Sequence, residues 1–281
     1  MGATVMSHEA LIRVGVFASF LLAMALWEAL AGFRPQNISR WQRWPSNLLI
    51  VVLNTLVLRL FFPLAAVGAA YLAADRGWGL FNLIALPSWL AVVVCFILLD
   101  LTIYFQHRLF HGVPWLWRLH RVHHTDLEFD ITTGLRFHPV EILLSIALKI
   151  MVVIALGAPA LAVLLFEVVL SSTAIFNHAN VSLPAWAERW ARLIVVTPDM
   201  HRVHHSIVRQ ETDSNFGFNL PWWDRLFTTY NKQPSAGQLG MVIGIEAFRQ
   251  PADLRLDKML IQPFLTPPTV DATDADQTIR R

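Results

Sequence analysis

The sequence predicts an all-α integral membrane protein: a helical bundle of three spanning helices plus a short helical hairpin, with a cytoplasmic, helical, histidine-rich cap. Apolar residues make up 55% of the chain and charged residues only 15%, whereas a soluble domain carries about 25% charged residues. Several apolar runs approach the roughly 20 residues that cross a bilayer core of about 30 Å. Ten of the 11 histidines lie between His107 and His205.

Composition also excludes some classes of protein. A formal net charge of +2 gives no reason to expect a nucleic-acid partner. Cys95 is the single cysteine, so neither an intrachain disulfide nor a cysteine-based metal site is possible.

Three apolar runs precede the histidines. The first, residues 10–33, is predicted to be a retained anchor, because it lacks a preceding basic segment and is too long for a signal peptide. The second, 47–74, contains Arg59, which is costly in lipid; either its side chain reaches the membrane surface or the helix breaks near Pro63. The third run covers 83–105.

Two shorter apolar segments, 142–156 and 161–176, flank Gly157-Ala158-Pro159, which is typical of a tight turn. They predict a membrane hairpin. Lys149 and Glu167 would lie at the same depth in it, and we expect them to pair because an unpaired charge there is expensive.

Basic residues predict the orientation. They follow the first run (Arg34, Arg40, Arg43) and the third (Arg108, Arg118, Arg121), whereas the intervening loop has only Arg76, offset by Asp75. The positive-inside rule then places the N-terminus outside, and the histidine cluster and C-terminus in the cytoplasm. An Ala- and Leu-rich composition favours a bacterial inner membrane.

We expect three regions along the chain. Residues 1–106 form the anchor helices, 107–232 the histidine-containing catalytic region with its membrane hairpin 141–177, and 233–281 a C-terminal extension. The last dozen residues, rich in Asp and Thr, are predicted to be a loose tail.

The histidines recur at helical spacing. His107 and His111 are four residues apart, so they share one face of a helix that extends the third run. The sequence His-Arg-Val-His-His occurs twice, at 120–124 and 201–205, and each copy places three imidazoles on one face. Pro114 is a favourable helix start, as is Pro198 after Thr197 as N-cap.

The number of imidazoles predicts the type of metal site. Imidazole suits zinc, copper, iron and nickel, and a single zinc takes three or four protein ligands. Eight to ten histidines match two ions with four or five nitrogen ligands each. A haem is disfavoured because the apolar segments contain no histidine. A zinc hydrolase would need the glutamate of HExxH, and neither histidine pattern supplies it.

These motifs resemble the sterol desaturase and fatty acid hydroxylase superfamily of membrane di-iron oxygenases. The resemblance covers about residues 100–230. It rests on Asp100-x-x-x-Tyr104-x-x-His107-Arg108-x-x-His111, Trp117-Arg118-x-His120-x-x-His123-His124, Arg136-x-His138-Pro139-x-Glu141, Asn177-His178, Pro198-x-x-His201-Arg202-x-His204-His205, Asn215-Phe216-Gly217 and Trp223-Asp224-Arg225-Leu226-Phe227-x-Thr229-Tyr230. Thr228 stands where the family pattern has Gly.

The resemblance implies a set of metal ligands: His107, His111, His120, His123, His124, His201, His204 and His205, with His178 as a ninth. His138 is either a further ligand or a residue that contacts a ligand, with helix-entry packing before Pro139 as the alternative. Asp100, Glu141 and Asp224 are candidates to accept the free N–H groups of ligating imidazoles; for Asp100, an ion pair with Arg108 is the alternative.

The resemblance further implies two iron ions, replaceable by zinc in purified samples, dioxygen as co-substrate and a lipid substrate. The expected reaction is hydroxylation of an unactivated C–H bond in a fatty acyl chain, sterol or ether lipid, with desaturation as the alternative. A non-catalytic metal- or sterol-binding protein is the alternative of another class.

No dinucleotide, haem or iron–sulfur motif is present. We therefore expect a separate electron-donor protein, of ferredoxin or cytochrome b type, with its reductase. Arg118, Arg121 and Arg202 could dock an acidic donor, or such arginines could serve only topology and headgroup contacts.

Overall fold

The computed structural model describes residues 8–267, and within that range the regular secondary structure is helical, with one isolated β-bridge between Ser206 and Ile243. The predicted all-α class is confirmed. The expected tail at the C-terminus lies outside the described residues.

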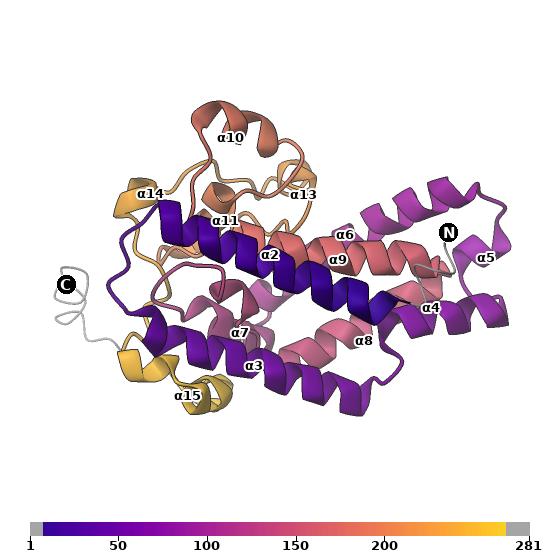
Figure 1. Ribbon diagram of the computed structural model, residues 1–281, viewed down its shortest axis with the longest axis horizontal. Helices are drawn as coiled ribbons and strands as arrows, with labels where there is room; N and C mark the ends of the chain where they lie inside the picture. The colour runs from indigo at the N-terminus through magenta and orange to yellow at the C-terminus, as the bar shows by residue number, and fades with distance from the viewer. Residues whose placement is uncertain (1–7, 268–281) are drawn as a thin grey trace.

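Five segments are long and apolar enough to cross a membrane: α2 (Glu9–Ala31), the stretch Arg40–Leu83, α6 (Ser88–Gly112), α8 (Pro139–Leu156) and α9 (Ala160–Asn177). Each helix of the predicted hairpin has 18 residues, so by length and composition each is also a candidate membrane-spanning helix. In Figure 1 the long helices run along the longest axis of the molecule.

The second apolar run is not one helix. It forms α3 (Arg40–Phe61) and α4 (Ala65–Arg76), followed by the short α5 (Leu80–Leu83). Pro63 lies in the break, where its missing N–H and fixed φ prevent the helix from continuing, and Ala65 adopts a positive φ of 50°. Of the two sequence-based alternatives, the break near Pro63 is therefore correct.

The cap forms at one end of the bundle, opposite α4 and α5 (Figure 1). Helix α6 continues to Gly112, and Pro114 begins α7 (Pro114–His124). The remaining cap elements are η1 (Thr133–Leu135), α10 (Ala185–Ala191), α11 (Pro198–His204), α12 (Arg209–Thr212), α13 (Trp222–Leu226), α14 (Gly237–Gly240), η2 (Pro251–Leu254), α15 (Leu256–Ile261) and η3 (Gln262–Phe264).

The hairpin forms as predicted. Gly157 ends α8 with a left-handed φ of 62°, a conformation that glycine adopts without strain. Lys149 Nζ lies 2.8 Å from Glu167 Oε1, which confirms the expected pair. Arg13 of α2 also contacts this carboxylate, at 2.6 Å from Oε2, and the sequence did not predict that contact.

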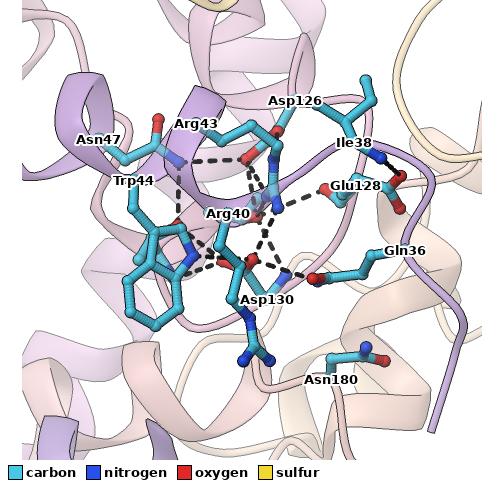
Figure 2. A network of polar contacts seen from close by, with 12 residues as sticks. Gln36, Ile38, Arg40, Arg43, Trp44, Asn47, Asp126, Glu128, Asp130 and Asn180 are labelled. Carbon is cyan, nitrogen blue, oxygen red and sulfur yellow. Dashed lines mark hydrogen bonds and ion pairs between the residues drawn. The ribbon is translucent and has the colours of Figure 1, made fainter. Parts of the chain in front are cut away.

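A buried polar network joins α3 to the loop between α7 and α8 (Figure 2). Arg43 is fully buried and binds both carboxylate oxygens of Asp126, at 2.7 and 2.8 Å. A third hydrogen bond of 2.7 Å reaches Asp130, which also accepts from Trp44 Nε1. The anchor helices are thus part of the cap structure and not merely a membrane tether.

Candidate metal centre

Nine of the predicted ligand histidines converge in the cap, and all nine are buried. They form two groups, in each of which one nitrogen per residue lies within 4.8 Å of the others. The five-histidine group contains His107, His111, His120, His124 and His204. The four-histidine group contains His123, His178, His201 and His205.

Helix geometry explains how neighbouring residues divide between groups. His107 and His111 project from the end of α6 on one face. His123 and His124 are adjacent on α7, so their side chains diverge and enter different groups. His204 and His205 divide in the same way at the C-terminal end of α11. Thr197 caps the first turn at the other end of this helix by accepting from Met200 N.

Backbone carbonyls determine the tautomers in the five-histidine group. His107 Nδ1 lies 2.9 Å from Phe216 O, and His204 Nδ1 lies 2.7 Å from Ser214 O. A carbonyl oxygen only accepts hydrogen bonds, so each Nδ1 carries the proton and each Nε2 has a free lone pair.

The Nε2 lone pairs of His107 and His120 point at each other with no proton between them. His120 Nδ1 lies 2.7 Å from the Glu141 carboxylate, and His120 Nε2 lies 3.1 Å from His107 Nε2. With both Nδ1 atoms as donors, two acceptor nitrogens face one another. That contact is repulsive unless a cation lies between them, so the donor set fits a metal ion.

In the four-histidine group, one imidazole is held in the same way. His178 Nδ1 donates to Ala174 O at 2.7 Å, which leaves its Nε2 as an acceptor. That Nε2 lies 3.2 Å from His123 Nε2 and 3.0 Å from His201 Nε2. Among the described residues, neither ring nitrogen of His205 has a hydrogen-bond partner.

Burial keeps these imidazoles neutral. It lowers the pKa of His120 and of His178 to about 3. Burial, reinforced by neighbouring imidazoles, holds the pKa well below the ordinary value at the cap positions His123, His124, His201, His204 and His205. Neutral imidazole is the form that binds metals.

The three carboxylates singled out in the sequence have different surroundings. Glu141 contacts an imidazole, as expected. Asp224 instead accepts from Phe216 N and Gly217 N, at 2.8 and 2.7 Å, and so fixes the loop whose carbonyl orients His107.

Asp100 contacts no histidine. It accepts from Trp223 Nε1 at 2.8 Å and from Leu220 N at 3.2 Å. No ion pair with Arg108 forms within residues 8–267, so neither sequence-based interpretation of Asp100 is correct.

Sequence reasoning missed Asp213, whose carboxylate lies 3.1 Å from His111 Nδ1. Asp213 is four residues after Arg209 and pairs with it at 2.6 Å. That spacing by itself indicates an ordinary surface ion pair, so it gave no signal of the contact with His111.

His138 lies outside both groups. Its Nδ1 accepts from Val140 N at 3.2 Å and caps α8, while its Nε2 lies 3.2 Å from Leu260 O. Both ring nitrogens are thus occupied, and of the roles considered from the sequence the geometry fits helix entry.

Two of the three arginines expected to dock a donor are interior residues. Arg121 donates to Gln262 O and Leu265 O and stacks on Phe248. Arg202 is fully buried and donates to Asp199 and Val181 O. The expectation that Arg121 and Arg202 face a partner protein is wrong, because both guanidinium groups donate to acceptors inside the protein. Arg118 remains partly exposed.

A cavity of about 330 Å³ adjoins the centre and is lined by His107, His120 and His123 together with apolar side chains of α2, α6, α8 and α9. It therefore touches imidazoles of both groups. An apolar cavity of this kind suits a hydrocarbon chain.

Fold and site define a helical membrane protein whose buried paired histidine groups fit a metal centre. Residues 92–229 match the Fatty acid hydroxylase family, which confirms the resemblance. It is 33% identical over 157 residues to an ornithine lipid hydroxylase of Rhizobium tropici, covering 55% of this chain and 46% of that one.

Two further relatives carry other substrate names. Human alkylglycerol monooxygenase is 26% identical over 184 residues, covering 64% of this chain and 39% of the relative. Rat cholesterol 25-hydroxylase is 29% identical over 151 residues, covering 53% and 49%. The chain thus matches less than half the length of each relative, and no solved structure matches it.

Proposed function

We propose that this protein is a membrane-bound oxidoreductase that hydroxylates an unactivated C–H bond of a lipid. The observation that carries this proposal is the apolar cavity that ends on His107, His120 and His123, since it would bring a hydrocarbon chain to imidazoles of both groups. The names of the relatives, all hydroxylases or monooxygenases, favour hydroxylation over desaturation.

The nine grouped histidines are the proposed ligands of two iron ions, one in each group; zinc could replace iron in purified protein. Iron bound there would supply the redox chemistry with dioxygen that an unactivated C–H bond requires. The protein's own contribution is to keep the imidazoles neutral, to fix their tautomers and to exclude water from the buried centre.

Electrons would come from a separate protein of ferredoxin or cytochrome b type. With Arg121 and Arg202 buried, exposed cations beside the centre are Arg118, two residues before His120, and Arg209, whose Nη2 donates to His111 O. We propose their surface as the docking site. The proposed location is a bacterial inner membrane, with the cap and C-terminus in the cytoplasm and the N-terminus outside.

Metal content per chain tests the function, after purification under iron-replete, anaerobic conditions. We expect close to two irons in the parent. His204→Ala should lose the iron of the five-histidine group, His123→Ala that of the four-histidine group, and the double variant both. His138→Ala is the matched control, because this histidine belongs to neither group, and it should retain two irons.

One zinc or no metal in a well-folded parent would contradict the oxygenase proposal and favour a binding or metal-handling role. Two irons would justify a search of membrane lipids for hydroxylated products that depend on the parent and are absent with the double variant.

A further inference from the structure

A second set of polar side chains lines the cavity: Arg13, Lys149 and Glu167, which we call the charged triad. Arg13 comes from α2, Lys149 from α8 and Glu167 from α9. All three residues line the same cavity as His107 and His120. Apolar side chains such as Phe17, Ile142 and Leu170 line it as well.

The triad lies well below the cap. Glu141, beside His120, and Lys149 are both on α8, and the span from 141 to 149 corresponds to about 12 Å at about 1.5 Å per residue. That depth is a large part of half a hydrocarbon core of about 30 Å. Charges at such depth are costly, and they commonly mark a functional site.

The hydrogen bonds within the triad show which donors remain available to a ligand. Both oxygens of Glu167 are occupied, Oε1 by Lys149 at 2.8 Å and Oε2 by Arg13 at 2.6 Å. Among the described residues, Lys149 Nζ has this single partner, although an ammonium has three N–H groups. Within residues 8–267, Arg13 donates only through Nη1, to Glu9 and Glu167, and its Nε and Nη2 donors have no protein partner.

Free donors and net charge point to the same ligand. Within the triad, two side chains are cationic and one is anionic. Glu9, which pairs with Arg13 at 3.2 Å, does not line the cavity, and Glu141, which does, lies against His120. The ion pair between Lys149 of α8 and Glu167 of α9 uses one N–H group of Lys149. It gives no role to the other N–H groups of Lys149 or to Nε and Nη2 of Arg13. A group that supplies acceptor oxygens and a negative charge complements them.

We propose that the charged triad binds the anionic oxygen group of the lipid substrate, a carboxylate or a phosphate, while the hydrocarbon chain extends along the cavity to the histidine centre. The separation of triad and centre then selects which carbon is exposed to oxidation. This inference rests on the proposed function for the identity of the ligand as substrate, but binding itself requires no turnover.

Binding is measured on the full chain, metal-loaded and without an electron donor, in nanodiscs of zwitterionic lipid, with protein-free nanodiscs subtracted. The probes are radiolabelled palmitate, hexadecyl phosphate and methyl palmitate. At least one of the two anions should bind about tenfold or more tightly than the uncharged ester, the difference expected from one charge-assisted hydrogen bond. Which anion binds tighter identifies the carboxylate or the phosphate.

Lys149→Met and Arg13→Met should each remove most of that preference. Lys258→Met is the matched control, because Lys258 is exposed on the cap and does not line the cavity. Equal binding of all three probes by the parent, or an undiminished preference in both triad variants, would overturn the proposal. If Lys149→Met does not fold, the test rests on the preference of the parent for the anionic probes and on the loss of that preference in Arg13→Met. Anion binding by a chain that holds no iron would reject the oxygenase function and leave the triad site standing.

Discussion

At the scale of single residues, the centre is organised largely by acceptors placed behind the imidazoles. Carbonyl oxygens of Ala174, Ser214 and Phe216 contact His178, His204 and His107. Carboxylates of Glu141 and Asp213 contact His120 and His111. Each contact fixes which nitrogen faces the middle of its group, and such partners orient ligands before a metal binds.

Glu141 should therefore control metal affinity at one group. Glu141→Leu removes the acceptor of His120 Nδ1–H, and we expect metal binding by the five-histidine group to weaken by about 10–100-fold. Glu141→Gln retains an acceptor oxygen and should lose less. Iron retained during dialysis against a graded series of chelator concentrations measures the effect.

Asp100→Asn is the control for this experiment, because Asp100 is equally buried yet contacts Trp223 instead of a histidine. It should keep both irons at every chelator concentration that the parent survives. Equal loss from Asp100→Asn and Glu141→Leu would mean that general damage to the fold, rather than the contact with His120, releases the metal.

The contrast between these residues shows what spacing can predict. Histidines at three- and four-residue intervals share a helical face, and this periodicity is visible in the sequence. The acceptors behind them depend on loops such as 213–217, whose path has no periodic signal. Main-chain carbonyls are also the same for every residue type, so their role cannot be read from side-chain identity.

At the scale of secondary-structure elements, Arg43 is the main link between α3 and the cap. Its guanidinium satisfies Asp126 and Asp130, both buried in the loop that follows His124. Breaking a buried ion pair from one side costs about 3–5 kcal/mol, since the remaining charges are left uncompensated. Arg43→Met should lower the free energy of unfolding by about that amount at neutral pH.

This loss should shrink on acidification. Burial raises the pKa of Asp130, but attraction to Arg43 outweighs it and holds that pKa below the ordinary value. The stabilisation by Asp130 is therefore complete above about pH 4, its unfolded pKa, and disappears as the pH falls through the lower folded value. In Arg43→Met protonation relieves the uncompensated charge of these carboxylates, so the difference in stability between parent and variant should shrink as the pH falls below about 4.

Thermal unfolding of both proteins across this pH range checks the prediction. Arg59→Met on the same helix is the control, because Arg59 is exposed, and it should follow the parent at every pH. A difference between parent and Arg43→Met that stayed constant down to pH 3 would assign the stabilisation to packing of the side chain rather than to its charge.

At the scale of the whole molecule, the sequence predicted the helical class and the gathering of the histidines on one side, because both follow from patterns of apolar and polar residues. It did not predict the burial of Arg43 and Arg121, which entered the topology argument simply as basic residues. Arg121 is satisfied by main-chain carbonyls of residues 262 and 265, and such partners leave no complementary charge in the sequence.

Because some of these arginines are interior, the orientation of the bundle needs a test independent of charge counting. In a Cys95→Ala background, Asp75→Cys places a thiol at the C-terminal end of α4 and Lys258→Cys places one in α15 on the cap, both at exposed positions. These sites lie toward opposite ends of the molecule in Figure 1. A membrane-impermeant maleimide should label the first variant in intact spheroplasts and the second only in inside-out vesicles. Labelling of the second variant in intact spheroplasts would place the histidine centre outside, where a cytoplasmic electron donor could not reach it.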